Sequence, residues 1–100
     1  MKHTLNETGG RLVIALEGNF IFSDHAAFQS VLERLHQQAV KDCVFDLAGL
    51  DFIDSTGLGM LVLANDVCER SGFFLRLINA HGQVRAVLER AEFGTIMTVE

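Results

Sequence analysis

Residues 43–59, CVFDLAGLDFIDSTGLG, decide how this chain is expected to fold. Residues 43–47 form a short apolar run, which is typical of a buried strand. The run Asp54-Ser55-Thr56 follows, and these residue types favour a helix start because their side-chain oxygens accept the unpaired backbone N–H groups there. We therefore expect a strand at 43–47, a short connection, and a helix that begins near Ser55.

The predicted helix extends from about Ser55 to Ser71 and stops at Gly72, the position that a C-terminal capping glycine prefers. At 100° per residue, one side is apolar and should face a sheet, whereas the opposite side is polar and should face solvent. The apolar side contains Met60, Leu61, Ala64, Val67 and Cys68, and the polar side contains Asn65, Asp66, Glu69 and Arg70. Leu58 and Val62 fall on the polar side, so the first turns of the helix are expected to expose apolar surface, which tends to mark a contact site.

The first part of the chain predicts a hairpin followed by a helix. A turn signal at residues 8–11 separates two candidate strands, and the second strand covers 12–17 and ends at Gly18. Ser23 or Asp24 is the expected N-cap of the helix. Its apolar residues recur at helical spacing: Phe28, Val31, Leu32, Leu35 and Ala39.

After Gly72 the chain predicts another strand, a helix and a last short strand. The strand covers residues 73–78, the helix closes near Gly94, and residues 95–99 are a candidate edge strand. The apolar stripe of this helix consists of Val84, Val87, Leu88 and Ala91. The eight Phe residues are the only aromatic residues available for the core, because the chain has no Trp or Tyr.

The predicted order is β-β-α-β-α-β-α with a final β. Strands that alternate with helices imply mainly parallel pairing after the opening hairpin, so we expect an α/β fold with a mixed sheet and helices packed against it. The chain has 100 residues, 49% of them hydrophobic and 21% charged, and it carries no repeat or linker-like segment. This length and composition predict a single domain over residues 1–100.

The charge balance disfavours nucleic acid as a direct partner. Lys and Arg number 8 against 13 Asp and Glu, which gives a net charge of −5, the wrong sign for contact with phosphates. No apolar run approaches the roughly 20 residues that span a bilayer, and residues 1–7 do not resemble a signal peptide. Two cysteines without paired spacing, Cys43 and Cys68, are typical of a reduced protein. We expect a cytoplasmic protein that does not insert into membranes.

No pattern in the sequence predicts catalysis, a metal site or a cofactor. The four histidines, His3, His25, His36 and His81, lack helical ligand spacing. The pair Gly57-x-Gly59 lacks the third glycine of a dinucleotide fingerprint, and no lysine follows to make a P-loop.

On residue chemistry alone, residues 54–59 fit either a plain helix cap or a contact site. Gly57 and Gly59 are poor helix formers, each costing about 1 kcal/mol relative to alanine. One explanation for both is close approach of another chain or of a phosphate to the backbone. Leu58 and Val62 would pack under a neighbouring segment if the turn were only a cap, and the spacing does not decide between the two readings.

Residues 52–59, FIDSTGLG, resemble the signature of STAS domains, specifically of the bacterial anti-sigma factor antagonists, in which Asp-Ser-[Ser/Thr]-Gly-Leu-Gly joins a strand to a helix. The resemblance extends to the element order and the chain length. It implies that Ser55 is the phosphorylated serine, with Asp54 before it and Thr56 after it. Taken together with the helix angles, we expect the partner-binding residues to be Asp24, Asp54, Thr56, Gly57, Leu58, Gly59 and Val62.

This resemblance implies a phosphorylation-controlled switch. The dephospho form would bind an anti-sigma factor that is a serine-protein kinase, and a PP2C-type phosphatase would restore that form. Many family members carry an acidic residue after the Gly-x-Phe/Leu that follows the second strand. Here Gly18-Asn19-Phe20 leads into Ile21 and the acidic residue comes only at Asp24, a departure that bears on the choice of partner.

Two other functions remain open. One is a STAS module that serves as a scaffold or as a small subunit of another complex, for example a membrane-transport complex, without a serine switch. The other is a receiver-like domain phosphorylated on Asp46, which ends a predicted strand. The opening hairpin, the short chain and the lack of an early acidic pair disfavour the receiver.

Overall fold

The computed structural model describes residues 1–37 and 41–100 as one five-stranded sheet with helices packed against it. The strands follow chain order across the sheet; β1 is antiparallel to β2, and the other neighbours are parallel. The predicted α/β class with a mixed sheet is confirmed. The elements are β1 (Lys2–Thr8), β2 (Arg11–Phe20), the 3-10 turn η1 (Phe22–Asp24), α1 (His25–Gln37), β3 (Asp42–Ile53), α2 (Ser55–Ser71), β4 (Phe74–Ile78), α3 (Gly82–Arg90), the 3-10 turn η2 (Phe93–Thr95) and β5 (Thr98–Val99).

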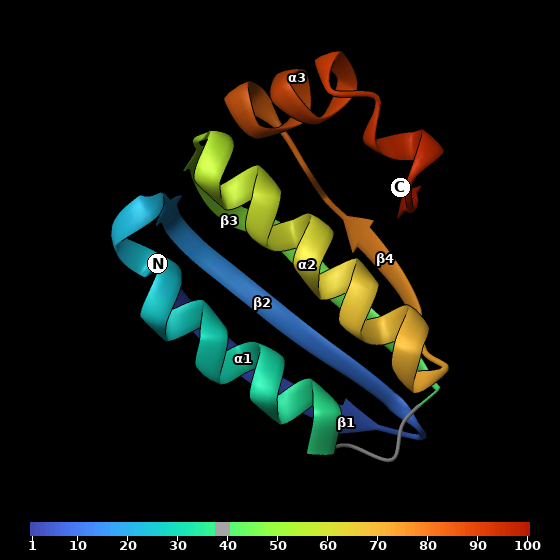
Figure 1. Cartoon of the computed structure of the whole chain (residues 1–100). Helices are drawn as coiled ribbons and strands as arrows, with labels where there is room; N and C mark the ends of the chain where they lie inside the picture. The colour runs from blue at the N-terminus through green and yellow to red at the C-terminus, as the bar shows by residue number, and fades with distance from the viewer. Residues whose placement is uncertain (38–40) are drawn as a thin grey trace.

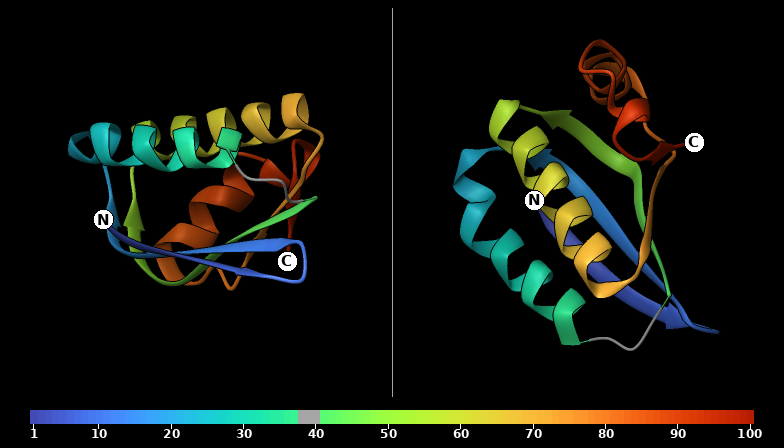
Figure 2. Two further views of the ribbon diagram at one scale, coloured as in Figure 1. Left: turned by 90° about the horizontal axis from the view of Figure 1, so that it is seen from below. Right: turned by 45° about the vertical axis from the view of Figure 1, so that its right-hand side comes forward.

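The helices are arranged unevenly over the sheet. Figure 1 shows α1 and α2 side by side in front of the strands, and the left view of Figure 2 shows them as one layer on the sheet. The third helix, α3, lies beyond the end of β4 and packs against β3. Each helix follows its strand through a short connection, so the start of the helix lies near the carboxyl end of the strand that precedes it.

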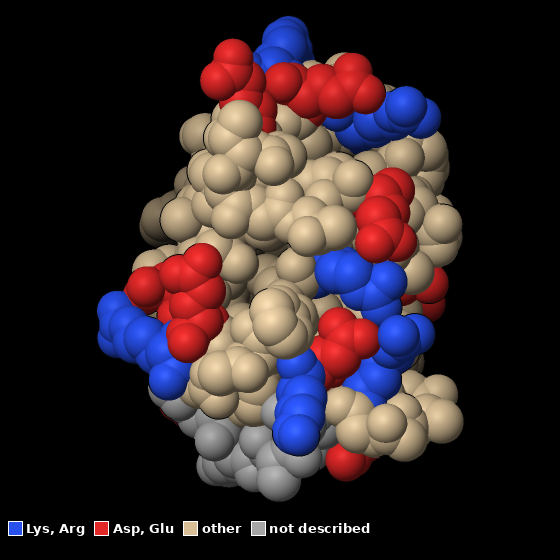
Figure 3. Space-filling view, turned by 90° about the vertical axis from the view of Figure 1, so that its right-hand side faces the viewer, with Lys and Arg blue, Asp and Glu red and all other residues tan. Residues whose placement is uncertain are grey.

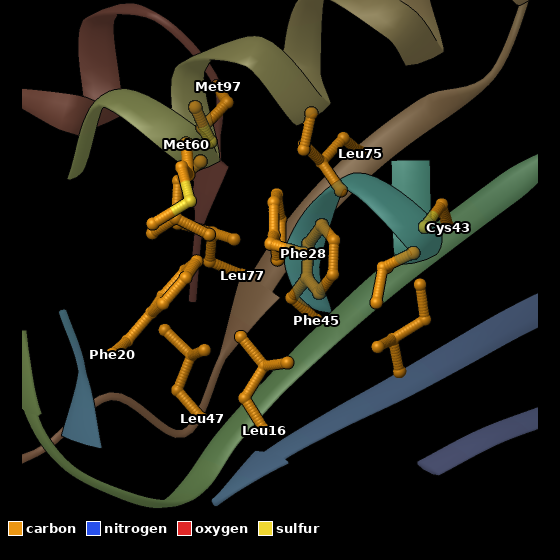
Figure 4. Close-up of a cluster of buried hydrophobic side chains, with 14 of the residues drawn as sticks. Leu16, Phe20, Phe28, Cys43, Phe45, Leu47, Met60, Leu75, Leu77 and Met97 are labelled. Atoms are coloured by element: carbon orange, nitrogen blue, oxygen red, sulfur yellow. The ribbon is translucent and has the colours of Figure 1, made fainter. Parts of the chain in front are cut away.

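The core fills the space between the sheet and the helices. Figure 4 shows Phe20, Phe28 and Phe45 meeting there from β2, α1 and β3. The ring centroid of Phe28 lies 4.9 Å from that of Phe20 and 5.9 Å from that of Phe45. The predicted apolar faces of the helices are buried, which confirms their periodicity, whereas Ala39 lies outside the described residues. Buried residues on these faces are Phe28, Val31, Leu32 and Leu35 of α1, Met60, Leu61, Ala64 and Cys68 of α2, and Val84 and Leu88 of α3.

Phenylalanine, however, is not confined to the core. Phe22, Phe52 and Phe74 are 73%, 42% and 77% exposed. Three of the eight phenylalanines therefore add nothing to the aromatic core; Phe22 lies in the turn η1, Phe52 near the end of β3 and Phe74 at the start of β4.

The predicted ends of the second and third strands are wrong. Neither strand stops at Gly18 or Leu47, because β2 and β3 go on pairing until Phe20 lies beside Ile53. The pairing contains two register shifts, between Ala15 and Glu17 and between Gly18 and Asn19. Such irregularities break the period-2 alternation by which a strand is recognised in sequence.

The other element boundaries differ less. The last strand is only Thr98–Val99, since Phe93–Thr95 form the turn η2 with Phe93 buried. Helix α3 ends at Arg90, so Ala91 is exposed rather than part of the apolar stripe. The carboxylate of Asp24 accepts a hydrogen bond from the amide of Ile21, three residues earlier in the chain (2.9 Å), and not from an amide of α1. The expectation that Asp24 caps α1 is therefore wrong.

Cys43 and Cys68 are both free and fully buried. The hydrogen bond between the two thiols and their burial raise the pKa of Cys43, so this thiol stays protonated and packs as an apolar group. The expectation of two reduced, buried cysteines is confirmed.

Helix α2 approaches β2 so closely that a side chain at Gly57 does not fit. A Cβ atom there would lie 2.5 Å from the Phe20 carbonyl oxygen and 2.7 Å from Cγ1 of Ile53. At Gly59, in contrast, a Cβ atom would meet nothing within 4 Å.

We predict that Gly57→Ala lowers the free energy of unfolding by about 1–3 kcal/mol, since the backbone must move to admit a methyl group. The matched change Gly59→Ala is expected to leave stability unchanged or raise it by up to about 1 kcal/mol through helix propensity. Urea unfolding of both variants measures the difference. Equal effects at the two positions would contradict the packing described above.

Candidate functional site

The carboxylate of Asp54 organises the turn between β3 and α2. Its Oδ1 accepts the Gly57 amide at 2.8 Å, which caps the helix, and its Oδ2 accepts the Phe22 amide at 3.2 Å. The Asp54 amide itself donates to the Phe20 carbonyl oxygen at 3.2 Å. One residue therefore joins the start of α2 to the end of β2 and to the turn η1. The predicted cap and the predicted helix bounds, Ser55–Ser71 with Gly72 as the C-cap, are confirmed.

The two hydroxyl residues that follow Asp54 differ in exposure. Ser55 is the first residue of α2 and its side chain is exposed, whereas Thr56 is half-buried. A modifying enzyme has to reach the hydroxyl oxygen, so the exposed hydroxyl of Ser55 is the more accessible of the two. The structure thus distinguishes Ser55 from Thr56 as a candidate acceptor.

The structure requires glycine at only one of the two glycine positions of the motif. Gly57 is buried and is required by the close approach of β2 within the chain itself. Gly59 is exposed, and no contact within the chain requires it. It leaves an open stretch of helix backbone one turn after Ser55, on the same side of α2.

Exposed apolar side chains lie along this side of α2. Val62 is 38% exposed and Leu63 is 45% exposed, whereas Leu58 is half-buried and packs against the core. Of the two residues predicted to expose apolar surface, only Val62 does so to this extent. Leu63 was missed, although helix angles place it about 40° from Gly59 and therefore beside it.

Phe22 adds a large apolar side chain near the start of α2. It is 73% exposed, and its backbone is held by Asp54. No local pattern in the sequence indicates this position, because the hydrogen bond joins residues 32 apart in the chain. We call Ser55, Gly59, Val62 and Leu63 together with Phe22 the Ser55 face.

Asp24 lies in η1, two residues after Phe22, but its carboxylate is used within the chain. Oδ1 pairs with the Met1 ammonium at 2.8 Å and Oδ2 accepts the Ile21 amide. Burial alone would raise the pKa of Asp24, but the hydrogen bonds and the charge of the ammonium outweigh burial and lower it. The side chain is 13% exposed, so its direct effect is to fix the turn that carries Phe22.

Several charged side chains elsewhere in the molecule form ion pairs. Figure 3 shows basic and acidic side chains interspersed on the side of the molecule that carries β4 and α3. Arg76 pairs with Asp42 and Glu100, and Arg85 pairs with Glu89. Near the Ser55 turn the sequence supplies the carboxylates of Asp51 and Asp54, so added negative charge there would meet like charge.

A cavity in the structure lies away from the Ser55 face. A cavity of about 360 Å³ is lined by residues of α3, η2 and β5 and their connections, and it includes none of the predicted site residues. In residues 1–37 and 41–100, no group of three or more His, Cys, Asp and Glu side chains is placed to hold a metal ion. No helix in the described part of the chain is long and apolar enough to cross a membrane.

Asp46, the residue considered for a receiver-like site, has a local role. Its Oδ1 accepts hydrogen bonds from the Ala48 amide and from the side-chain amide of Asn79, both at 3.0 Å. It links the middle of β3 to the residue that follows β4, and neither of these hydrogen bonds involves the Ser55 turn.

Comparisons with known proteins address the fold and the family. The sequence matches the STAS domain family over residues 2–100. A STAS-domain containing protein of Pseudomonas aeruginosa is 30% identical over 91 residues, which cover 91% of this chain and 89% of that protein.

Among the solved proteins that are similar in structure are an anti-sigma factor antagonist and a sulfate transporter family protein. The anti-sigma factor antagonist SpoIIAA of Bacillus, in its unphosphorylated form, has a TM-score of 0.76 and 20% identity, over 99% of this chain and 87% of that one. Its phosphorylated form has a TM-score of 0.72 and 23% identity, over 99% of this chain and 91% of that one. A sulfate transporter family protein from Wolinella succinogenes has a TM-score of 0.79 and 22% identity, over 92% of this chain and 77% of that one.

Because the identities to these solved structures are low, the structural similarities show a shared fold and nothing more. The family match covers nearly the whole chain, and the Pseudomonas relative agrees with it over nine-tenths of the chain. This chain belongs to the STAS domain family.

Proposed function

We propose that this protein is an anti-sigma factor antagonist whose binding to its partner is controlled by phosphorylation of Ser55. The unmodified Ser55 face binds an anti-sigma factor that is also a serine-protein kinase, and that kinase phosphorylates Ser55. A PP2C-type phosphatase removes the phosphate in the cytoplasm and restores binding. The observation that carries the proposal is an exposed serine at the start of α2, beside open backbone at Gly59 and exposed Val62 and Leu63.

The position of Ser55 explains how a phosphate could be tolerated by the fold. The Leu58 amide is bonded to the Asp54 carbonyl and the Gly57 amide to the Asp54 side chain. The amides of Ser55 and Thr56, in the first turn, have no partner within the helix. These amides and the helix dipole favour an anion, so a phosphate at Ser55 need not unfold the domain.

The same phosphate would oppose docking. It adds about −1.5 to −2 charges at neutral pH, directly after Asp54 in the chain and on the same side of α2 as apolar side chains that a partner must desolvate. Burying such a charge without a cationic partner costs several kcal/mol. The added charge on the surface would then prevent docking, while the fold of the domain stays unchanged.

The similarity to SpoIIAA, solved in phosphorylated and unphosphorylated forms, supports this proposal. The similarity to a sulfate transporter family protein supports a second candidate, a STAS module that is a subunit or scaffold of another complex without a serine switch.

The charge state of residue 55 distinguishes the two candidates. Wild type, Ser55→Ala and Ser55→Asp are used as baits in host lysate, and bound proteins are quantified by mass spectrometry. We predict a serine-kinase partner that wild type and Ser55→Ala retain equally and that Ser55→Asp retains at least tenfold less. The control is Ser71→Asp, the same substitution at an exposed serine at the other end of α2. Equal retention by all four baits would leave Ser55 as an ordinary first residue of α2 and favour the scaffold.

Gly59 provides an independent test of the docking surface. Gly59→Phe places a bulky side chain where the structure has open space, so we expect the fold to survive and partner retention to fall at least tenfold, since about 1.4 kcal/mol is a tenfold change in affinity. Ala27→Phe, at an exposed position of α1, is the matched control and should bind like wild type. Urea unfolding checks that both variants are folded, and unchanged retention by Gly59→Phe would exclude this face of α2 as the docking site.

A further inference from the structure

The last part of β3 has a strand neighbour on only one side. β4 pairs with β3 from Asp42 to Asp46 and ends there, whereas β2 accompanies β3 to Ile53. The backbone groups of residues 47–53 that point away from β2 therefore lack a neighbouring strand. Buried or half-buried backbone groups of this kind require other partners.

The side chain of Gln83 supplies such partners at Ile53. Its Oε1 accepts the Ile53 amide at 3.0 Å, and its Nε2 donates to the Ile53 carbonyl oxygen at 2.9 Å. A single carboxamide thus makes the two hydrogen bonds that a strand neighbour would make. Further back along the same segment, Nε2 of His81 lies 2.8 Å from the Ala48 carbonyl oxygen.

The backbone before α3 is shaped to direct these two side chains toward β3. Asn79 and Gly82 have φ values of 62° and 56°, a left-handed conformation that asparagine and glycine tolerate best. A Cβ atom at Gly82 would meet nothing within 4 Å, so the conformation and not space accounts for the glycine. Val84 and Leu88 are buried and anchor the helix that carries Gln83.

Ile53 directly precedes the residue that organises the Ser55 turn. On one side the Asp54 amide is bonded to Phe20 of β2, and on the other side both backbone groups of Ile53 are bonded to Gln83 of α3. We propose that Gln83 is a positioning residue: through Ile53 it holds Asp54 where its carboxylate caps α2 and presents Ser55. Helix α3, which contributes no residue to the Ser55 face, thereby controls the rigidity of that face.

Amide hydrogen exchange of the folded protein, followed by NMR, tests this claim without any partner. Gln83→Met keeps the length of the side chain but removes both hydrogen bonds. We expect the amides of Ile53 and Gly57 to exchange about tenfold faster or more, the effect of losing one or two hydrogen bonds, while core amides such as that of Ile14 keep their rates. Gln29→Met, at an exposed glutamine of α1, is the matched control.

A conservative variant separates positioning from a general loss of stability. Gln83→Glu keeps an acceptor for the Ile53 amide but loses the donor to its carbonyl oxygen, so exchange at Ile53 should fall between wild type and Gln83→Met. Unchanged rates at Ile53 and Gly57 in Gln83→Met would overturn the proposal, and so would an equal acceleration of every amide.

The link from Gln83 to binding rests on the proposed function, and the two can fail separately. If Ser55→Asp loses the partner, we expect Gln83→Met to weaken partner retention as well. If exchange changes locally in Gln83→Met while all Ser55 variants retain the same proteins, the positioning role stands and the serine switch falls. If Ser55→Asp loses the partner while exchange in Gln83→Met is unchanged, the switch stands and the positioning role falls.

Discussion

The two hydrogen bonds of the Asp54 carboxylate hold the candidate site together. One oxygen caps α2 through the Gly57 amide, and the other holds the turn that carries Phe22. A helix cap alone contributes about 1 kcal/mol, but this carboxylate also joins segments 32 residues apart. Together with the Asp54 amide, which donates to Phe20, these bonds link the turn η1, the start of α2 and the end of β2 through one residue.

The contrast between Gly57 and Gly59 separates what the fold requires from what it leaves available. Gly57 is needed because α2 lies against the Phe20 carbonyl oxygen, whereas Gly59 faces open space. A residue that lowers helix propensity without a packing reason within the chain is consistent with a role toward another molecule. The exposed Val62 and Leu63 lie one turn further along the same side.

Features determined by neighbouring residues could be predicted from the sequence. The order of elements, the bounds of α2, its Asp54 cap and its Gly72 terminus all follow from helical periodicity and capping chemistry. Features determined by distant pairing could not. The extension of β3 to Ile53 depends on β2 and on register shifts, and the contact of Gln83 with Ile53 joins residues 30 apart. Exposure of Phe22 has no local signature either, whereas Leu63 could have been identified from its helix angle.

The central claim is that phosphorylation changes the surface at Ser55 and leaves the fold intact. The most direct measurement compares protein carrying phosphate on Ser55 with unmodified protein, by urea unfolding and by affinity for the partner captured by the unmodified form. The account predicts that the free energy of unfolding changes by less than about 1 kcal/mol, because the helix start accepts an anion, while affinity falls at least a hundredfold. Equal affinity of the two forms, or loss of binding that accompanies unfolding of the phosphorylated domain, would contradict it.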